Sequence, residues 1–256
     1  MTGLDHDSGG DDGHDFRAQR LYVEPDLADG TRVELTREQA NYLMNVLRLK
    51  SGEQILVFNG RDGEWRAALE PVTRRDAVLN VVSRQRAQSG GPDLHYLFAP
   101  LKRSRLDYMV QKATELGVAR LQPVLTRYTV AERVNGERMR ANVIEASEQC
   151  GILRVPEVAA PVSLQRLAQA WEPARRLIFC DEAAPIHDPV QALAAVPPGP
   201  LAVLIGPEGG FSPDERAMLS ALPSVTRLSL GHRIMRADTA AVAALALVNA
   251  VLGDWR

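Results

Sequence analysis

Two glycine-bearing segments in the C-terminal half contain residues suited to holding a small ligand. In the first, the apolar run at residues 201–205 leads into Gly-Pro-Glu-Gly-Gly-Phe at residues 206–211. Glycine permits positive φ angles and lets a ligand approach the backbone closely. Ser212 and Glu215 then have the spacing of a capping box at a helix start. The pattern predicts a sharp, backbone-exposing turn at the end of a strand, which fits either a ligand-binding loop or a plain tight turn.

The second segment, Leu-Gly-His-Arg-Ile-Met-Arg-Ala-Asp-Thr at residues 230–239, follows the next expected strand and precedes an alanine-rich helix. Loops at neighbouring strand ends of a parallel sheet can form two walls of one pocket. Asp238 fits either a helix cap or a functional carboxylate, and His232 fits either a surface position or a catalyst.

Several common binding patterns are missing. The first loop lacks the Gly-Lys-Ser/Thr ending of a P-loop, and the Gly-x-Gly-x-x-Gly spacing of a Rossmann site is absent. No carboxylate pair suited to magnesium stands out, and Cys150 and Cys180 lack the Cys-x-x-Cys spacing of a zinc site. We therefore expect no metal. Both cysteines are expected to be buried, structural residues of a reducing compartment.

The elements that would position these loops alternate between strands and helices. Such alternation predicts a mostly parallel sheet covered by helices, with ligands bound beyond the carboxyl ends of the strands. A last helix is expected from residue 239 to 251. The expected strands of this part, the domain at residues 94–256, are residues 94–99, 120–124, 176–180, 201–205 and 226–230.

Residues 18–88 have a different, β-rich pattern that is interrupted by one helix. Thr36 and Gln39 form a capping box for a helix that would run to Leu47. This pattern predicts a small β-barrel domain, joined to the next domain by a linker at residues 84–93. Its expected strands are residues 20–23, 32–35, 54–58, 64–69 and 77–82.

The charge is distributed unevenly along the 256 residues. The whole chain has a formal net charge of -2, but residues 1–16 hold five aspartates and no lysine or arginine, so the remainder has a net charge of +3. Residues 1–17 are predicted to be a disordered acidic tail. Nearly all basic residues are arginine, which fits phosphate recognition or a genome that favours arginine codons. No stretch resembles a membrane span or a secretory signal, so a cytoplasmic protein is expected.

Several motifs together resemble one family. The segments at residues 204–215 and 230–236 are similar to the two signature segments of RsmE, the bacterial 16S rRNA uridine N3-methyltransferase family of the SPOUT class. The resemblance extends to Gln-Lys-Ala-Thr-Glu-Leu-Gly-Val at residues 111–118 and to Glu-Ala-Ser-Glu-Gln-Cys-Gly at residues 145–151. It covers the chain from about residue 20 to the end.

This resemblance implies a knotted α/β domain that binds S-adenosylmethionine, a PUA-like barrel at residues 18–88 that grips RNA, and a homodimer. Its target would be 16S rRNA, within the small ribosomal subunit. The cofactor contacts that the resemblance implies are Phe179, Glu182, Leu204, Ile205, Gly206, Glu208, Gly209, Gly210, Leu230, Gly231, Arg233, Ile234, Met235 and Arg236.

Methylation at N3 places further demands on the site. Uracil N3 must lose a proton, so a base or a cation near the uracil oxygens is needed. Arg236 is the expected cation, and Glu208 or Asp238 the expected base or orienting group. The sequence departs from the family here, since Ala237 and Asp238 stand where the family usually has Thr and Glu. Candidates for RNA binding, or for a merely solvated charged face, are Arg48, Lys50, Lys102, Arg103 and Arg105.

Two other functions fit the same residues. A non-enzymatic RNA-binding factor for ribosome assembly would keep the barrel, although the intact glycines argue against it. A SPOUT enzyme that methylates another RNA position would keep both loops.

Overall fold

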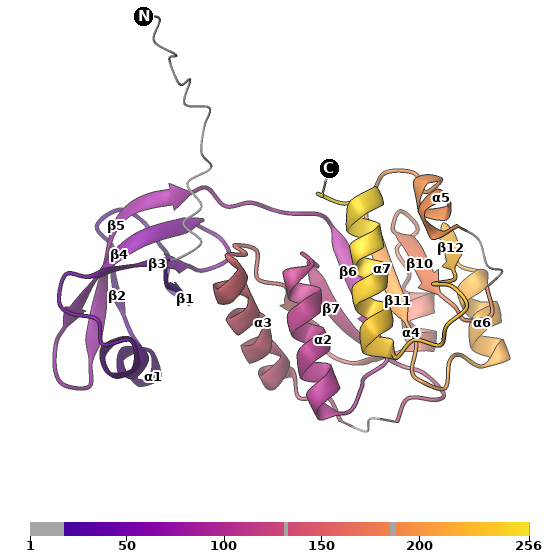
Figure 1. Ribbon diagram of the computed structural model, residues 1–256, viewed down its shortest axis with the longest axis horizontal. Helices are drawn as coiled ribbons and strands as arrows, with labels where there is room; N and C mark the ends of the chain where they lie inside the picture. Colours follow the sequence, from indigo (N-terminus) through magenta and orange to yellow (C-terminus); the bar gives the residue numbers. More distant parts are fainter. Residues whose placement is uncertain (1–17, 131–132, 185–187, 256) are drawn as a thin grey trace, which may run out of the picture. The chain divides into compact units, whose positions relative to one another are not determined.

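The chain forms two compact units in this computed structural model, Met1–Ser89 and Gly90–Arg256. The structure describes residues 18–130, 133–184 and 188–255 (Figure 1). The expected acidic tail at residues 1–17 lies outside these residues. The boundary between the units falls inside the predicted linker, although the last strand of the first unit continues to Arg86 and so occupies the start of that linker.

The N-terminal unit is a curled five-stranded sheet with one helix. The sheet has the order β1-β3-β4-β5-β2, in which only β1 and β3 are parallel neighbours. Its core is formed by buried aliphatic side chains of the strands and by Ala40 and Leu43 of the helix. The strands are β1 (Arg20–Tyr22), β2 (Arg32–Glu34), β3 (Gln54–Phe58), β4 (Glu64–Pro71) and β5 (Ala77–Arg86).

The helix of this unit begins as predicted and ends differently. Thr36 and Gln39 make both hydrogen bonds of the capping box at the start of α1 (Arg37–Asn41). The α-helix then widens into the π-helical turn η1 (Tyr42–Val46), so the prediction of one regular helix to residue 47 was wrong. Arg48 follows with a φ of 59°. The amides of residues 47 and 49 donate to the carbonyls of Tyr42 and Leu43, five and six residues earlier, instead of four as in a regular α-helix.

The C-terminal unit is a parallel sheet with helices on both faces, as predicted (Figure 1). Its sheet order is β12-β10-β11-β6-β7-β8, and β9 also pairs with β7. The strands are β6 (Leu94–Phe98), β7 (Arg120–Leu125), β8 (Glu157–Val158), β9 (Val162–Ser163), β10 (Arg176–Cys180), β11 (Leu201–Ile205) and β12 (Val225–Leu228). The helices are α2 (Arg103–Glu115), α3 (Gly136–Cys150), α4 (Leu164–Gln169), α5 (Pro189–Ala194), α6 (Pro213–Ser220) and α7 (Ala237–Val251).

Two hydrophobic cores sandwich this sheet. One core joins the sheet to α2, α3, α5 and α7, and the other joins it to α4 and α6. All five residues of β11 are buried, as expected for a central parallel strand covered on both faces. Among the described residues, no helix is long and apolar enough to cross a membrane. Cys150 is exposed, so the prediction of a buried side chain was wrong: it is the last residue of α3, one turn beyond the buried Ala146 and Ser147.

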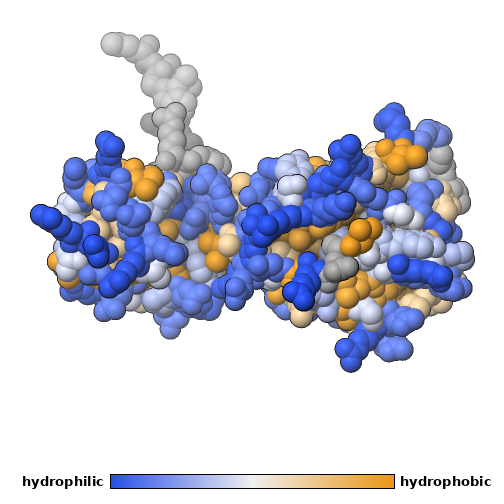
Figure 2. Space-filling view, turned by 90° about the horizontal axis from the view of Figure 1, so that it is seen from below, coloured by the Kyte–Doolittle hydropathy of each residue, from blue (hydrophilic) through white to orange (hydrophobic). Residues whose placement is uncertain are grey.

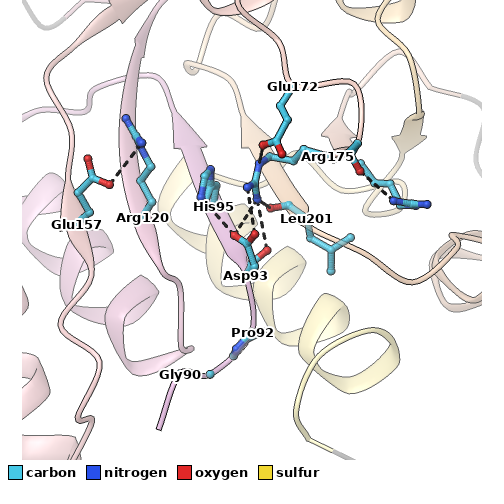
Figure 3. A network of polar contacts seen from close by, with 12 residues as sticks. Gly90, Pro92, Asp93, His95, Arg120, Glu157, Glu172, Arg175 and Leu201 are labelled. Atoms are coloured by element: carbon cyan, nitrogen blue, oxygen red, sulfur yellow. Dashed lines mark hydrogen bonds and ion pairs between the residues drawn. The ribbon is translucent and has the colours of Figure 1, made fainter. Parts of the chain in front are cut away.

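A polar network fixes the amino ends of the central strands (Figure 3). Arg175, only 8% exposed, donates to both carboxylate oxygens of Asp93 at 2.9 and 3.2 Å and to the carbonyl of Leu201 at 3.1 Å. His95 Nε2 lies 3.4 Å from Asp93 Oδ1. Burial, together with the nearby Arg175 guanidinium, lowers the pKa of His95 from 6.5 to about 4.

We predict that His95 makes the C-terminal unit less stable in mild acid. Between pH 6.5 and pH 4 an unfolded histidine binds a proton that the folded His95 does not bind, so the free energy of unfolding falls as the pH falls. From about pH 7 to about pH 4.5 the loss from this residue is about 2 kcal/mol. Urea unfolding at both pH values, for the natural chain and His95→Gln, measures it. An equally steep pH dependence in His95→Gln would contradict the assignment.

Candidate cofactor site

Three strand ends meet around one cavity in the C-terminal unit. The cavity has a volume of about 390 Å³ and is lined by segments that follow β10, β11 and β12. Because the strands are parallel, their carboxyl ends face the same edge of the sheet. The predicted cofactor residues on its wall are Glu182, Ile205, Gly206, Glu208, Gly209, Gly210, Leu230, Gly231, Arg233, Ile234 and Met235. Both glycine-bearing segments therefore border the same cavity.

The first loop is a tight turn under steric constraint. The amide of Gly210 donates to the carbonyl of Pro207 at 2.9 Å, and Gly210 has a φ of 68°, where a side chain would be strained. A Cβ on Gly206 would collide with the ring of Phe211, which is buried directly beneath. Phe211 packs edge-on against Phe179, with 5.0 Å between ring centroids.

Two predicted contacts lie under this loop and not on the cavity wall. Phe179 and Leu204 are fully buried in the core that includes Phe211. They are paired neighbours in β10 and β11, so their side chains point to the same face of the sheet. They support the loop from below.

The helix after the loop begins as the sequence predicts. Ser212 and Glu215 make both hydrogen bonds of the capping box at the start of α6. Glu215 also accepts a hydrogen bond from the amide of Arg127 at 2.7 Å. One carboxylate therefore connects α6 to the segment that follows β7.

Asp181 holds the third wall, which was expected from residues 179–182, although the role of this carboxylate was not predicted. The side chain of Asp181 is 0% exposed. The carboxylate accepts hydrogen bonds from Arg216 of α6 at 3.0 Å and from Arg227 of β12 at 2.6 Å. The amide of Ala183 donates to the same carboxylate at 3.1 Å. Burial alone would raise the pKa of Asp181, but these hydrogen bonds outweigh it, so the pKa lies below its usual value. The carboxylate stays charged and connects three elements around the cavity.

The second loop is open on its outer side. β12 ends at Leu228, two residues before the predicted end, and Gly231 has a φ of 100°. The side chain of Ile234 is fully exposed. Figure 2 shows this end of the unit, where hydrophobic surface lies between hydrophilic residues. A ligand or a partner has direct access to the loop.

Of the three predicted catalytic residues, one lies on the cavity wall and two lie outside it. Glu208 lies on its wall and forms an ion pair with Arg105 of α2. Arg236 is exposed and supplies the backbone cap of α7, outside the wall. Asp238 lies in the first turn of α7, where its carboxylate accepts a hydrogen bond from the amide of Thr239, so it is not the residue that caps the helix.

The other predicted RNA-binding residues are at the surface. Lys102 and Arg103 are exposed at the start of α2, and Arg105 is partly exposed. Arg48 and Lys50 are exposed in the N-terminal unit. Positive charge is thus accessible in each unit.

Among the described residues, neither a reactive thiol nor a metal-binding group adds chemistry to the cavity. Cys180 lies on the wall, and burial raises the pKa of its thiol to about 12. At neutral pH the thiol is therefore protonated and is a poor nucleophile. Within the part of the chain that the structure describes, no group of three or more His, Cys, Asp or Glu side chains could hold a metal ion.

We predict that Asp181→Asn destabilises the C-terminal unit by about 2 kcal/mol, because two arginines lose a buried charged partner. Glu157→Gln is the matched control, since Glu157 forms a single exposed ion pair with Arg120 and should change stability by less than about 1 kcal/mol. Urea unfolding of the two variants gives both values. Equal effects of the two substitutions would show that Asp181 does not hold the wall.

Comparison with known proteins places this geometry in a family. The chain matches the model of an RNA methyltransferase domain over residues 89–249 and that of an RNA methyltransferase PUA domain over residues 35–82. It is 28% identical to ribosomal RNA small subunit methyltransferase E of Rickettsia conorii, over 91% of this chain and 96% of that protein. It is 32% identical to the Synechocystis protein of the same name, over 92% of this chain and 78% of the relative.

Solved structures agree with these matches. A methyltransferase from Legionella pneumophila in complex with bound SAM is 31% identical, with a TM-score of 0.80 over 93% of this chain and 99% of that one. The ribosomal RNA small subunit methyltransferase E from Neisseria gonorrhoeae has the same fold, with a TM-score of 0.83 over 94% of this chain and 100% of that one, at 24% identity. The predicted fold class, a parallel α/β domain preceded by a PUA-like domain, is confirmed. The chain belongs to the ribosomal RNA small subunit methyltransferase E family.

Proposed function

We propose that this chain transfers a methyl group from S-adenosylmethionine to N3 of a specific uridine in 16S rRNA of the small ribosomal subunit. The observation that carries the proposal is the single cavity bordered by both glycine-bearing segments. Family membership supports rRNA methylation, and the SAM-bound relative from Legionella supports the cofactor. Position N3 and the 16S target are proposed from the resemblance of the two signature segments.

The residues present fit this cofactor. A volume of about 390 Å³ lies in the usual range of small-molecule pockets. Ile205, Leu228 and Leu230 provide apolar wall for an adenine ring, while the backbone of Gly209 and Gly210 can be approached closely. Glu182 adds a carboxylate for polar groups such as an amine or a ribose hydroxyl. We propose the predicted wall residues as the cofactor contacts, with Phe179 and Leu204 supporting them from beneath.

The site must also prepare the uracil. The cofactor supplies an electrophilic methyl group on a sulfonium, so much of what the protein adds is alignment. Arg236 is exposed next to the cavity segment and, among the described residues, has no side-chain partner, which leaves its guanidinium available to stabilise a uracilate. Glu208 or Asp238 would orient the uracil edge or accept the N3 proton.

The remaining parts have matching proposed roles. The domain at residues 18–88 would bind RNA through Arg48 and Lys50, and the domain at residues 94–256 through Lys102, Arg103 and Arg105. Phosphate contacts of this kind position a protein on RNA without reading its sequence. We further propose a cytoplasmic homodimer, as the family resemblance implies.

Methyl transfer to small-subunit particles that lack the modification tests the proposed function. After incubation with S-adenosylmethionine, the rRNA is digested to nucleosides, and we expect N3-methyluridine at one position.

Arg236→Ala should lower kcat at least about 100-fold, because it removes charge stabilisation of the transition state, while cofactor affinity changes little. Arg236→Lys keeps the charge and should retain part of the activity.

Each other outcome has a distinct meaning. A different methylated nucleoside would move the target to another RNA position. Binding of S-adenosylmethionine without any transfer would favour a non-enzymatic assembly factor. Near-normal turnover by Arg236→Ala would remove the role assigned to Arg236.

A further inference from the structure

An exposed tyrosine stands beside the glycine loop. Tyr128 lies in the segment between β7 and α3, and 43% of it is exposed. A Cβ built on Gly209 would lie 3.3 Å from Tyr128 Cβ and 3.6 Å from its Cγ. The tyrosine thus packs against the outer side of a residue that lines the cavity. Its ring is at the rim of the site.

The backbone under Tyr128 is held in place. The amide of Thr126 donates to the hydroxyl of Thr129 at 2.9 Å, and the amide of Thr129 donates back to the carbonyl of Thr126 at 3.2 Å, which closes a four-residue turn. The amide of Arg127 donates to Glu215 at the start of α6. Tyr128 therefore occupies the tip of a turn that is tied to the helix following the glycine loop.

A uracil that has left its stack is held well by a large aromatic ring, and the described residues of the cavity wall include no Phe, Tyr or Trp. N3 lies on the Watson-Crick edge, so the target base must leave its pair and its stack before it can react. Among the residues that the structure describes, the one aromatic ring that lines the cavity is the smaller imidazole of His232. Phe211, the ring beneath the loop, is 2% exposed and cannot be reached by a base.

We propose that Tyr128 is a substrate-binding residue that stacks against the flipped target uracil. This inference rests on the proposed function, because it takes an RNA base as the ligand. Arg127, the exposed neighbour of Tyr128, supplies a cation for the adjoining phosphate. Aromatic rings alternating with cations are the usual means of binding single-stranded RNA.

The decisive comparison uses Tyr128→Leu and Tyr128→Phe in the full chain, with small-subunit particles lacking the modification. Leucine keeps apolar bulk but has no ring, whereas phenylalanine keeps the ring and loses only the hydroxyl. Loss of one base stack should raise the KM for RNA roughly 10-fold or more in Tyr128→Leu. Since stacking holds the base in both ground and transition states, kcat should change far less. Tyr128→Phe should retain the natural KM, and both variants should bind S-adenosylmethionine normally.

Trp255→Leu is the matched control. Trp255 is also an exposed aromatic, at 57%, but it follows the end of α7 that lies away from the cavity. Its replacement should leave the KM for RNA unchanged. The equilibrium affinity of the natural chain and the three variants for the same RNA can be compared without turnover. This measurement tests the stacking role even if the natural chain fails to methylate uridine.

Three results would overturn the proposal. One is a natural KM and RNA affinity in Tyr128→Leu. A second is equal impairment of Tyr128→Leu and Tyr128→Phe, which would assign the effect to the hydroxyl. The third is a change of molecular mass in solution for Tyr128→Leu alone, because exposed Leu125 and Val130 next to it would then belong to a contact between copies of the chain.

Discussion

Cys180 is paired on both sides, with Ile205 of β11 and with Leu228 of β12, so three parallel strands end at the same level of the sheet. The rest of the site depends on this register. A parallel strand of a doubly covered sheet delivers its following loop to one edge, and three aligned ends deliver three loops to one place. Without that alignment, the two glycine-bearing segments would be separate turns.

The aligned strand ends bring two arginine side chains close together, and the carboxylate of Asp181 neutralises part of their charge. Arg216 and Arg227 bring positive charge to the cavity from α6 and β12, and the carboxylate after β10 binds both. Removal of one partner from such a buried group is costly, so the three walls are coupled. Glu215 likewise connects two elements through one carboxylate: it caps α6 and also accepts a hydrogen bond from the turn that carries Tyr128.

The parts of the fold with strong local patterns could be predicted from the sequence. β3, β10 and β11 have the predicted bounds, because each is an apolar run with clear turn residues around it. β8 and β9 were missed, since two residues are too few to show a period. The widened turn after α1 also has no local signal, because the apolar spacing of residues 40–47 is that of an ordinary helix.

The site could be predicted as two segments but not as an arrangement of side chains. The glycine spacing at strand ends indicated the segments, and the resemblance to a family supplied the individual contacts. It counted Phe179 among them, whereas strand alternation turns this side chain into the core. The segment that contains Asp181 was expected at the site, but the role of its carboxylate was not, and Tyr128 was missed. A single acid after a strand, or a single tyrosine in a loop, has no distinctive spacing. Their importance arises from contacts with residues far away in the sequence.

The central claim, that the glycine loop forms a wall of the S-adenosylmethionine pocket, is tested most directly by calorimetric titration of the cofactor into Gly210→Ala. Gly117→Ala is the control, because Gly117 has a similar φ of 73° but lies at the end of α2, away from the cavity. We expect the natural chain and Gly117→Ala to bind alike and Gly210→Ala to bind at least about tenfold more weakly, since the added methyl group strains the turn against Glu182. Equal affinity in all three proteins would contradict the account.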